Sequence, residues 1–441
     1  MDLTQGSIVK SLLIYAWPVV LSSLLQSAYS ITDLIVAGWF IGEGGISAIN
    51  NASQVMQILT QIIMGITTGG NILMSQYYGS RDPVNREKTN RTLFFFSVTA
   101  GAVMTVAVLV LSRPILIGLR APALEEATAY LIVCALGLIP IFGYNALSAM
   151  LRSVGNSRQP FYCVAVTAGV NIVLDCLFMG AFHWGVRGAA LATVLAQGVS
   201  AAGIALYGWR RVPLLRLERR HCKVSRGELG RIMNYSLLTC VQQSIMNFGI
   251  LLVQGLVNSF GPVIMAAFAA AVKIDSFAYM PVQDFGNAFS TFVAQNYGAG
   301  RKDRIRSGIW RAVLLAFGFC AVVSTAVILF AKPLMLLFVQ PQETEILAEG
   351  VWYLQVVAAF YWGIGLLFLL YGYYRAVKRP GMSVVLTVIS LGTRVVLAYL
   401  LSGPVGVTGI WAAIPIGWVL ADLTGVGYYI FLQRRAAAKA R

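Results

Sequence analysis

Long apolar runs separated by short polar stretches make up most of this chain. The runs are about 20 residues or longer, the length that a helix rising 1.5 Å per residue needs to cross about 30 Å of hydrocarbon. We count twelve such runs, at 11–38, 48–78, 92–112, 127–149, 160–181, 187–209, 231–257, 264–296, 308–331, 348–371, 381–402 and 408–432. The pattern predicts an all-α membrane protein with twelve transmembrane helices.

Composition supports the membrane prediction and narrows the possible chemistry. The mean hydropathy is +0.74, and only 11% of the residues are charged, against about 25% in soluble domains. The six cysteines have no paired spacing, and His183 and His221 are the only histidines. We therefore expect no disulfide framework, no histidine-based metal site or catalytic triad, no cofactor and no enzyme activity.

The net charge of +16 has a topological explanation. Lysines and arginines gather in alternate loops, on the side that also holds both termini, whereas the opposite loops carry Arg113, Arg120, Arg187 and Lys332. The positive-inside rule then places both termini in the cytoplasm. The basic charge thus indicates orientation in a lipid bilayer, and no nucleic-acid partner is expected.

The chain also repeats itself. Residues 76–79 read "QYYG" and residues 295–298 read "QNYG", so that three positions match at a constant shift of 219, and Pro114 matches Pro333 at the same shift. Each half holds six predicted helices, which gives both halves the same orientation in the membrane. We predict two pseudo-symmetric six-helix lobes, 1–209 and 231–441, joined by a cytoplasmic linker at 210–230. Gly79 and Gly298 are interpreted as helix stops at the cytoplasmic ends of helices 2 and 8.

Two carboxylates lie inside predicted membrane helices of the first half. Asp33 in helix 1 and Asp175 in helix 5 fall at similar depths, roughly 8–10 Å below the outer surface. Asn171 lies one turn from Asp175 on the same helix face. A charge in the membrane is costly and indicates function by default. The three side chains fit either Na+ or a shared proton, and their types do not decide between the ions.

The repeat argues against a purely structural role for these groups. Farther along the chain the shift drifts by a few residues, so that "RSV" at 152 matches "RAV" at 375. At the matching positions of the second half stand Leu252 for Asp33, Arg394 for Asn171 and Ala398 for Asp175. The fold itself therefore does not require the polar side chains, although buried, neutral packing residues remain the alternative.

The second half has charged candidates of its own. Lys273 and Asp275 lie in helix 8, Arg394 in helix 11 and Asp422 in helix 12. Asp275 and Arg394 have similar predicted depths and are expected to pair. A structural ion pair and a conformational or substrate-sensing role are both open.

Polar stripes run along several of the predicted helices. They are candidates for lining a substrate cavity between the lobes, since pockets are mostly apolar with a few polar groups. Their members are Gln26 and Tyr29 on helix 1, Gln54, Gln57 and Gln61 on helix 2, and Gln243, Asn247 and Gln254 on helix 7. Amides that hold helices together are the alternative.

Several segments resemble one known family. They are "DLTQGSIVKSLLIYAWPVV", "ITDLIVAGWFIG", the paired "QYYG" and "QNYGAG" junctions, "LRSVGNSRQP", "NIVLDCLF" and "GVRGAALATVLAQ". In order and spacing the chain resembles the multidrug and toxic compound extrusion (MATE) transporters. The resemblance implies two six-helix lobes of the MATE/MOP type. It also implies export of cationic or amphiphilic compounds in exchange for Na+ or H+.

The carboxylates are most like those of the bacterial DinF-like branch. That resemblance implies a coupling-ion site at Asp33, Asn171 and Asp175, with Thr193 of helix 6 and Tyr130 of helix 4 as further members. The acids that the NorM-like branch carries in helices 7 and 10 have no counterpart inside 231–257 or 348–371.

We therefore expect a monomeric multidrug antiporter in the bacterial plasma (inner) membrane. Its partners would be small organic cations, amphiphilic drugs and the surrounding lipid, and its coupling ion H+ or Na+. The alternative is a flippase or exporter of a lipid or lipid-linked substrate, whose cleft would need more basic residues to hold phosphate. A membrane enzyme or receptor would need a catalytic constellation or a soluble sensing domain, and neither is visible.

Overall fold

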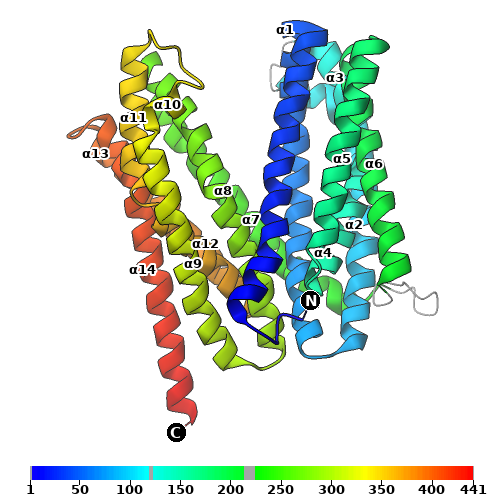
Figure 1. Ribbon diagram of the computed structural model, residues 1–441, viewed down its shortest axis with the longest axis vertical. Helices are drawn as coiled ribbons and strands as arrows, with labels where there is room; N and C mark the ends of the chain where they lie inside the picture. The colour runs from blue at the N-terminus through cyan, green and yellow to red at the C-terminus, as the bar shows by residue number, and fades with distance from the viewer. Residues whose placement is uncertain (1, 119–122, 213–223, 441) are drawn as a thin grey trace. The chain divides into compact units, whose positions relative to one another are not determined.

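The computed structural model describes residues 2–118, 123–212 and 224–440, which contain helices and no strand (Figure 1). The helices are α1 (Ile8–Gly79), α2 (Pro83–Gly118), α3 (Leu124–Leu136), α4 (Leu138–Ser153), α5 (Arg158–Asp175), a π-helical turn η1 (Cys176–Ala181), α6 (Gly185–Arg211), α7 (Arg226–Asn258), α8 (Pro262–Gly298), α9 (Lys302–Leu329), α10 (Ala331–Met335), α11 (Thr344–Ala358), α12 (Tyr361–Ala376), α13 (Pro380–Ser402) and α14 (Val407–Ala440).

The twelve predicted membrane helices are confirmed. In the described part of the chain, ten helical segments are long and apolar enough to cross a membrane, and two bent pairs raise the number to twelve. Two of the ten, Ile8–Ile41 and Ser47–Gly79, lie within α1. Gly79 and Gly298 end α1 and α8, as predicted.

Two predicted helices differ from expectation because each is broken. The segment expected at 127–149 consists of α3 and α4, which meet at 45°, and the segment expected at 348–371 consists of α11 and α12, which meet at 51°. In the first, Pro140 has no N–H to offer the carbonyl of Leu136, where α3 ends. The second break follows Ala358 and has no proline. The fourth helix of each half is thus bent, in keeping with the repeat.

The chain divides into two compact units, which we call unit 1 (Asp2 and Trp17–Cys240) and unit 2 (Leu3–Ala16 and Val241–Arg441). The division expected from sequence, at 1–209, 210–230 and 231–441, stays a prediction. Residues 213–223 of the expected linker lie outside the described residues.

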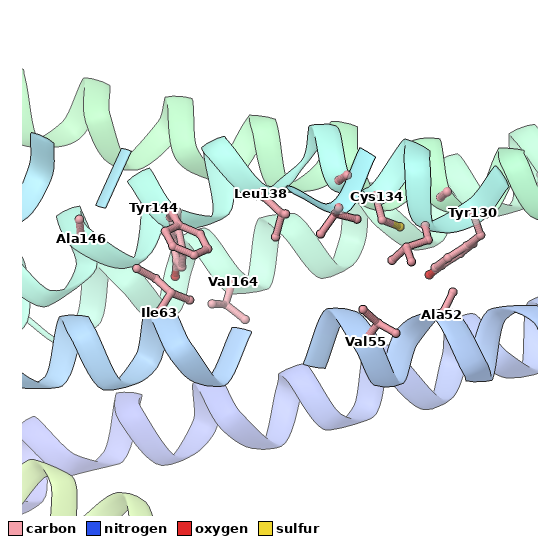
Figure 2. Packing of buried hydrophobic residues seen from close by; sticks show 14 of the residues in the cluster. Ala52, Val55, Ile63, Tyr130, Cys134, Leu138, Tyr144, Ala146 and Val164 are labelled. Atoms are coloured by element: carbon pink, nitrogen blue, oxygen red, sulfur yellow. The ribbon is translucent and has the colours of Figure 1, made fainter. Parts of the chain in front are cut away.

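Unit 1 is a helical bundle with a continuous apolar core. α2 packs on α3 and α4, and α6 packs on α3, α4 and α5. Figure 2 shows Val55 and Ile63 of α1 facing side chains of the neighbouring helices, among them Leu138 and Tyr144. Lipid chains are as apolar as these side chains, so close van der Waals packing between the helices, rather than exclusion of water, stabilises the bundle.

Unit 2 is built around α8 and α12. α8 packs on α11 and α12, α9 packs on α12, and α13 packs on α14. Its core contains an aromatic cluster, in which Phe268 stacks on Trp411 at 5.3 Å between ring centroids and Tyr353 meets Trp411 edge-on at 4.9 Å. In Figure 1 the helices of this unit change in colour along the chain, from yellow-green at α9 to red at α14.

The repeated junctions at 76–79 and 295–298 hold chain segments from distant parts of the sequence. In unit 1, the Tyr77 hydroxyl donates to Glu228, at the start of α7, at 3.2 Å. In unit 2, the backbone N–H of Leu3 donates to Gln295 Oε1 at 3.0 Å, and Asn296 donates to the carbonyl of Leu3 at 3.2 Å. Each junction therefore fixes the beginning of a long helix.

Arg304 completes the junction of unit 2. Its guanidinium donates to the carbonyls of Leu3, Gln5 and Gly6, with N···O distances of 2.7–3.2 Å. The segment before α1 has no regular structure of its own, so these charge-assisted bonds satisfy its carbonyl groups.

Candidate functional site: a buried carboxylate pair in unit 1

The structure brings Asp33 and Asp175 together. Asp33 is supplied by α1 and Asp175 by the last residue of α5, and their carboxyl groups lie close enough to interact directly. Asp175 is only 1% exposed. Asp33 Oδ1 and both carboxylate oxygens of Asp175 are buried, and no described residue gives them a hydrogen bond of ordinary geometry. Buried polar atoms are nearly always satisfied, so three orphaned oxygens in one place need an explanation.

A local change of helix type positions Asp175. Residues Cys176–Ala181 directly after it form a π-helix, in which the Phe182 N–H donates to the carbonyl of Leu177 at 2.9 Å. The wider turn begins one residue beyond the carboxylate. Single π-turns inside helices are rare and are frequent at functional sites.

Asn171 adds an amide to the pair. It lies one turn before Asp175, about 6 Å along the same helix face, and it is 1% exposed. Neither its carbonyl oxygen nor its amide nitrogen has a hydrogen-bond partner among the described residues. An unsatisfied buried amide costs about 1–3 kcal/mol for each unpaired group, which fits a side chain kept for a ligand.

Two tyrosines stand beside Asp33. Tyr29, one turn earlier on α1, interacts with the Asp33 carboxylate and with Gln197 of α6. Tyr130 of α3 interacts with Asp33, and its hydroxyl also meets Ser53 and Cys134. Figure 2 shows Tyr130 pointing from α3 toward Ala52 of α1, next to Cys134. The hydroxyls offer both donors and oxygen ligands to whatever occupies the pair.

Thr193, the predicted member of the site on α6, has a hydrogen bond within its own helix. Its hydroxyl donates to the carbonyl of Ala189 in its own helix at 3.1 Å. Gln197, one turn further along α6, makes the contact with Tyr29 instead. Sequence reasoning missed Gln197 and Ser53. Gln197 lies four residues after Thr193, on the same helix face, and this spacing could have predicted it. Nothing in the sequence marked Ser53.

The polar stripes keep their status as candidates. Gln26, Gln54, Gln57 and Gln61 are exposed on unit 1, and Asn247 is exposed on unit 2 while Gln243 is half-buried. Gln254 donates to Asn258 in its own helix at 2.8 Å, which favours a local role for it. That the stripes line a common cavity stays a prediction.

The charged candidates of unit 2 are arranged differently from the expected pair. Asp275 is buried and accepts a hydrogen bond from the Tyr353 hydroxyl at 3.3 Å. Arg394 attracts Asp275 over a longer distance, but the two groups form no direct ion pair within 4 Å. Lys273 is exposed and lies 5.8 Å from the ring centroid of Phe338. Asp422 is buried, and neither carboxylate oxygen has a partner in the described part of unit 2.

The donor set of the site fits a small monovalent cation better than a tightly held metal. Nowhere in residues 2–118, 123–212 and 224–440 do three or more His, Cys, Asp or Glu side chains form a metal-binding group. The pair instead offers two carboxylates, one amide and nearby hydroxyls. Such hard oxygen ligands suit Na+, and two close carboxylates equally suit a shared proton.

Twelve apolar helices, a twofold repeat and a carboxylate pair buried inside one unit are the features of a multi-pass membrane transporter. A model of the MatE family matches residues 18–177 and 239–400, once in each half. The chain belongs to this family of membrane transporters.

Curated relatives match along nearly the whole chain. The probable multidrug resistance protein YpnP of Bacillus subtilis is 28% identical over 443 residues, covering 99% of this chain and 98% of that protein. The probable multidrug resistance protein NorM of Thermotoga maritima is 25% identical over 418 residues, covering 91% and 88%.

Solved structures confirm the fold. A multidrug resistance MATE family transporter of the MOP superfamily in an outward-facing conformation gives a TM-score of 0.91 at 22% identity, covering 100% of this chain and 98% of that one. A MOP superfamily transporter from Pyrococcus furiosus gives 0.90 at the same identity and coverage.

Proposed function

We propose that this protein is a cation-coupled exporter of organic cations and amphiphilic drugs. Membership of the MatE family and the multidrug names of its relatives support drug export. The observation that carries the coupling mechanism is the close approach of Asp33 and Asp175, with Asn171 beside them and three buried carboxylate oxygens that receive no ordinary hydrogen bond from the described residues.

The electrostatics of the pair require a positive charge. Two ionised carboxylates that interact directly in a low-dielectric interior repel each other strongly and lose their hydration. At least one proton or one cation must therefore accompany them. Asn171 and the hydroxyls of Tyr29 and Tyr130 then complete the surroundings of the bound ion. Whether the ion is H+ or Na+ is decided by experiment, because the ligand types suit both.

Ion binding can drive the transport cycle only if two conformations of the protein bind the ion with different affinities. In the proposed cycle the ion enters from outside, neutralises Asp33 and Asp175 and stabilises the conformation of unit 1 that releases drug outward. Release of the ion inward returns the carboxylates to their charged state and resets the cycle. Uphill drug export then follows from the downhill movement of the ion.

The proposed setting is the bacterial inner membrane, with a monomeric protein and both termini in the cytoplasm. The alternation of basic loops supports this orientation. The lipid flippase considered from sequence is not favoured, since YpnP and NorM bear multidrug names.

Dye efflux from reconstituted vesicles tests the proposal. Purified protein is placed in liposomes loaded with a fluorescent cationic dye, and pH and Na+ gradients are imposed separately. We expect one gradient to drive transport, and Asp33→Asn and Asp175→Asn each to slow it on the order of tenfold or more. Glu125→Gln, at an exposed acid of α3, is the matched control. Normal transport by both Asp variants would refute the assignment.

A further inference from the structure

A groove with a volume of about 740 Å³ lies on unit 2, and none of its lining residues belongs to the carboxylate site. Its floor comes from α12 and from Phe289 of α8, and its two walls come from α9 and α14. The α9 wall holds Arg306, Ile309, Trp310, Val313 and Phe317. The groove is thus built entirely from residues of one compact unit.

Ring contacts along the groove fix its direction. The first turn of α12 meets α9 through the rings of Trp362 and Phe317, whose centroids lie 5.7 Å apart. The last turn of α12 meets α14 through the rings of Tyr373 and Tyr429, whose centroids lie 5.4 Å apart. The first turns of α9 and the last turns of α14 therefore lie at the same end of the groove.

The chemistry of the groove changes along this axis. Arg306, Gln433 and Arg434 all fall at the end formed by the start of α9 and the end of α14, whereas Phe317 and Leu366 line the other end. From Arg306 to Phe317 the α9 wall rises about 17 Å. That length is close to one leaflet, half of a hydrocarbon core about 30 Å thick.

The two arginines at the polar end have no ion-pair partner among the described residues. Arg306 and Arg434 are exposed, form no ion pair with any described residue, and share a groove whose described lining has no acidic side chain. Arg304, two residues before Arg306, is by contrast fully used in holding the segment before α1.

Aromatic residues complete the polar end. Trp310 is 67% exposed on α9, one turn beyond Arg306, and Tyr373 and Tyr429 pack edge-on between α12 and α14. Tryptophan and tyrosine are enriched at the level of the lipid headgroups, where one part of the ring is apolar and another is polar.

We propose that this groove binds an anionic phospholipid of the cytoplasmic leaflet. One acyl chain lies along the apolar length between α9 and α14, and the phosphate lies between Arg306 and Arg434, which offer it charge-assisted hydrogen bonds. The placement in the cytoplasmic leaflet rests on the orientation proposed above. The lipid is a bound ligand that stabilises unit 2, not a transported substrate.

Native mass spectrometry and thermal unfolding test the charge requirement. Detergent-purified full-length protein is titrated with dioleoyl phosphatidylglycerol or dioleoyl phosphatidylcholine. We expect phosphatidylglycerol to bind saturably and to raise Tm, and phosphatidylcholine to do neither to the same extent. Arg306→Gln and Arg434→Gln should each weaken phosphatidylglycerol binding about fivefold.

Neighbouring arginines provide matched controls. Arg311→Gln on α9 and Arg435→Gln on α14 remove the same charge from exposed positions outside the groove lining. These variants should bind phosphatidylglycerol like the wild type. Equal weakening by all four variants would mean general surface electrostatics and would overturn the proposal, as would equal binding of the two lipids.

The apolar wall is tested by filling it. Val313→Trp and Val426→Trp place a bulky ring in the groove and should remove the phosphatidylglycerol-dependent rise in Tm. Val322→Trp, on the same α9 helix at a position that is 70% exposed and outside the groove, is the control. Retained lipid binding in both filled variants, or displacement of the lipid by a cationic export dye, would overturn the assignment of the groove to a phospholipid.

Discussion

Thr105 and Ser324 stand 219 positions apart and make the same bond in their own units. Thr105 of α2 donates its hydroxyl to the carbonyl of Ala135 at 3.0 Å, and Ser324 of α9 donates to the carbonyl of Ala358. Both carbonyls lie at the breaks between the bent helix pairs. A hydroxyl from the neighbouring helix thus adds a hydrogen bond to a carbonyl at each bend, and the Thr105 hydroxyl shares its proton with the carbonyl of Gly101 at 2.9 Å.

Removing either hydroxyl should destabilise the protein modestly. We expect Thr105→Val and Ser324→Ala each to lower the free energy of unfolding by about 1 kcal/mol, because each removes one hydrogen bond at a bend. Thermal unfolding in detergent is the measurement. Thr99→Val, at an exposed position of α2, should leave Tm unchanged, and a wild-type Tm in both test variants would contradict the role given to the hydroxyls.

Glu228 should be the most sensitive position of the junction in unit 1. It is buried and accepts hydrogen bonds from Tyr77 at 3.2 Å, Thr89 at 3.0 Å and Arg231 at 3.0 Å. We expect Glu228→Gln to lower the free energy of unfolding by about 1.5–3 kcal/mol, the value of hydrogen bonds to a charged group. The Arg231 contact contributes least, since its side chain is 58% exposed. Glu125→Gln is the control, and equal Tm values for the two variants would exclude the proposed anchor.

The site in unit 1 should separate stability from transport. Asn171→Leu removes two unsatisfied polar atoms, so we expect it to be neutral or stabilising in thermal unfolding while ion-driven dye efflux falls. Asp175→Asn should behave in the same way, because it removes charge repulsion with Asp33. If these variants unfold at lower temperature and transport normally, Asn171 and Asp175 are packing residues after all.

The crossing of α8 and α12 should reject any added side chain. A Cβ built on Gly372 would meet the carbonyl oxygen of Gly286 at 2.5 Å. We expect Gly372→Ala to cost about 1–3 kcal/mol of stability, as overpacking does. Gly392 in α13 has nothing within 4 Å of such a Cβ, and Gly392→Ala should be neutral or stabilising by up to about 1 kcal/mol. Similar Tm changes in both variants would contradict the close approach of the two helices.

Asp82 should give unfolding a pH dependence outside the membrane. The backbone N–H of Asn85 donates to Asp82 Oδ1 at 3.1 Å at the start of α2, and this bond, followed by that of the Asn85 side chain, lowers the pKa of Asp82. A lowered pKa means that the contribution is present above the unfolded value of about 3.9 and is lost as pH falls through the folded value. Asp82→Ala should therefore lower Tm at pH 7, and its difference from the wild type should shrink as the pH falls below the unfolded value.

Asp82→Asn keeps a capping oxygen without the charge. Its Tm relative to that of Asp82→Ala should change little between pH 7 and about pH 3, because neither side chain titrates there. A constant Tm difference between wild type and Asp82→Ala across this range would show that the carboxylate charge is irrelevant to the cap.

The sequence was sufficient to predict the membrane helices and to single out Asp33 and Asp175, which the structure brings together. Apolar runs of membrane length have few alternative structures, and a carboxylate such as Asp33 or Asp175 inside such a run is conspicuous because it is costly. The repeat at Gln76 and Gln295 predicted the division of the helices into two sets of six in the same way.

Other features depend on contacts that no local pattern encodes. The residues "CLFMGA" at 176–181 carry no signal that separates a π-helix from an α-helix. Ser53 faces Tyr130 from a different helix, and Glu228 meets Tyr77 across 151 positions. Asp275 and Arg394 attract each other, as expected, but they form no direct ion pair, and Tyr353 donates the hydrogen bond to Asp275 instead.

The membership of Leu3–Ala16 in unit 2 has a consequence for folding. The beginning of α1 is encoded in the first half of the gene yet completes the bundle formed by the second half, while Arg226–Cys240 of α7 does the reverse. Either half expressed alone would therefore leave the end of a long helix without the residues that it packs on, and the two halves should not fold when expressed separately.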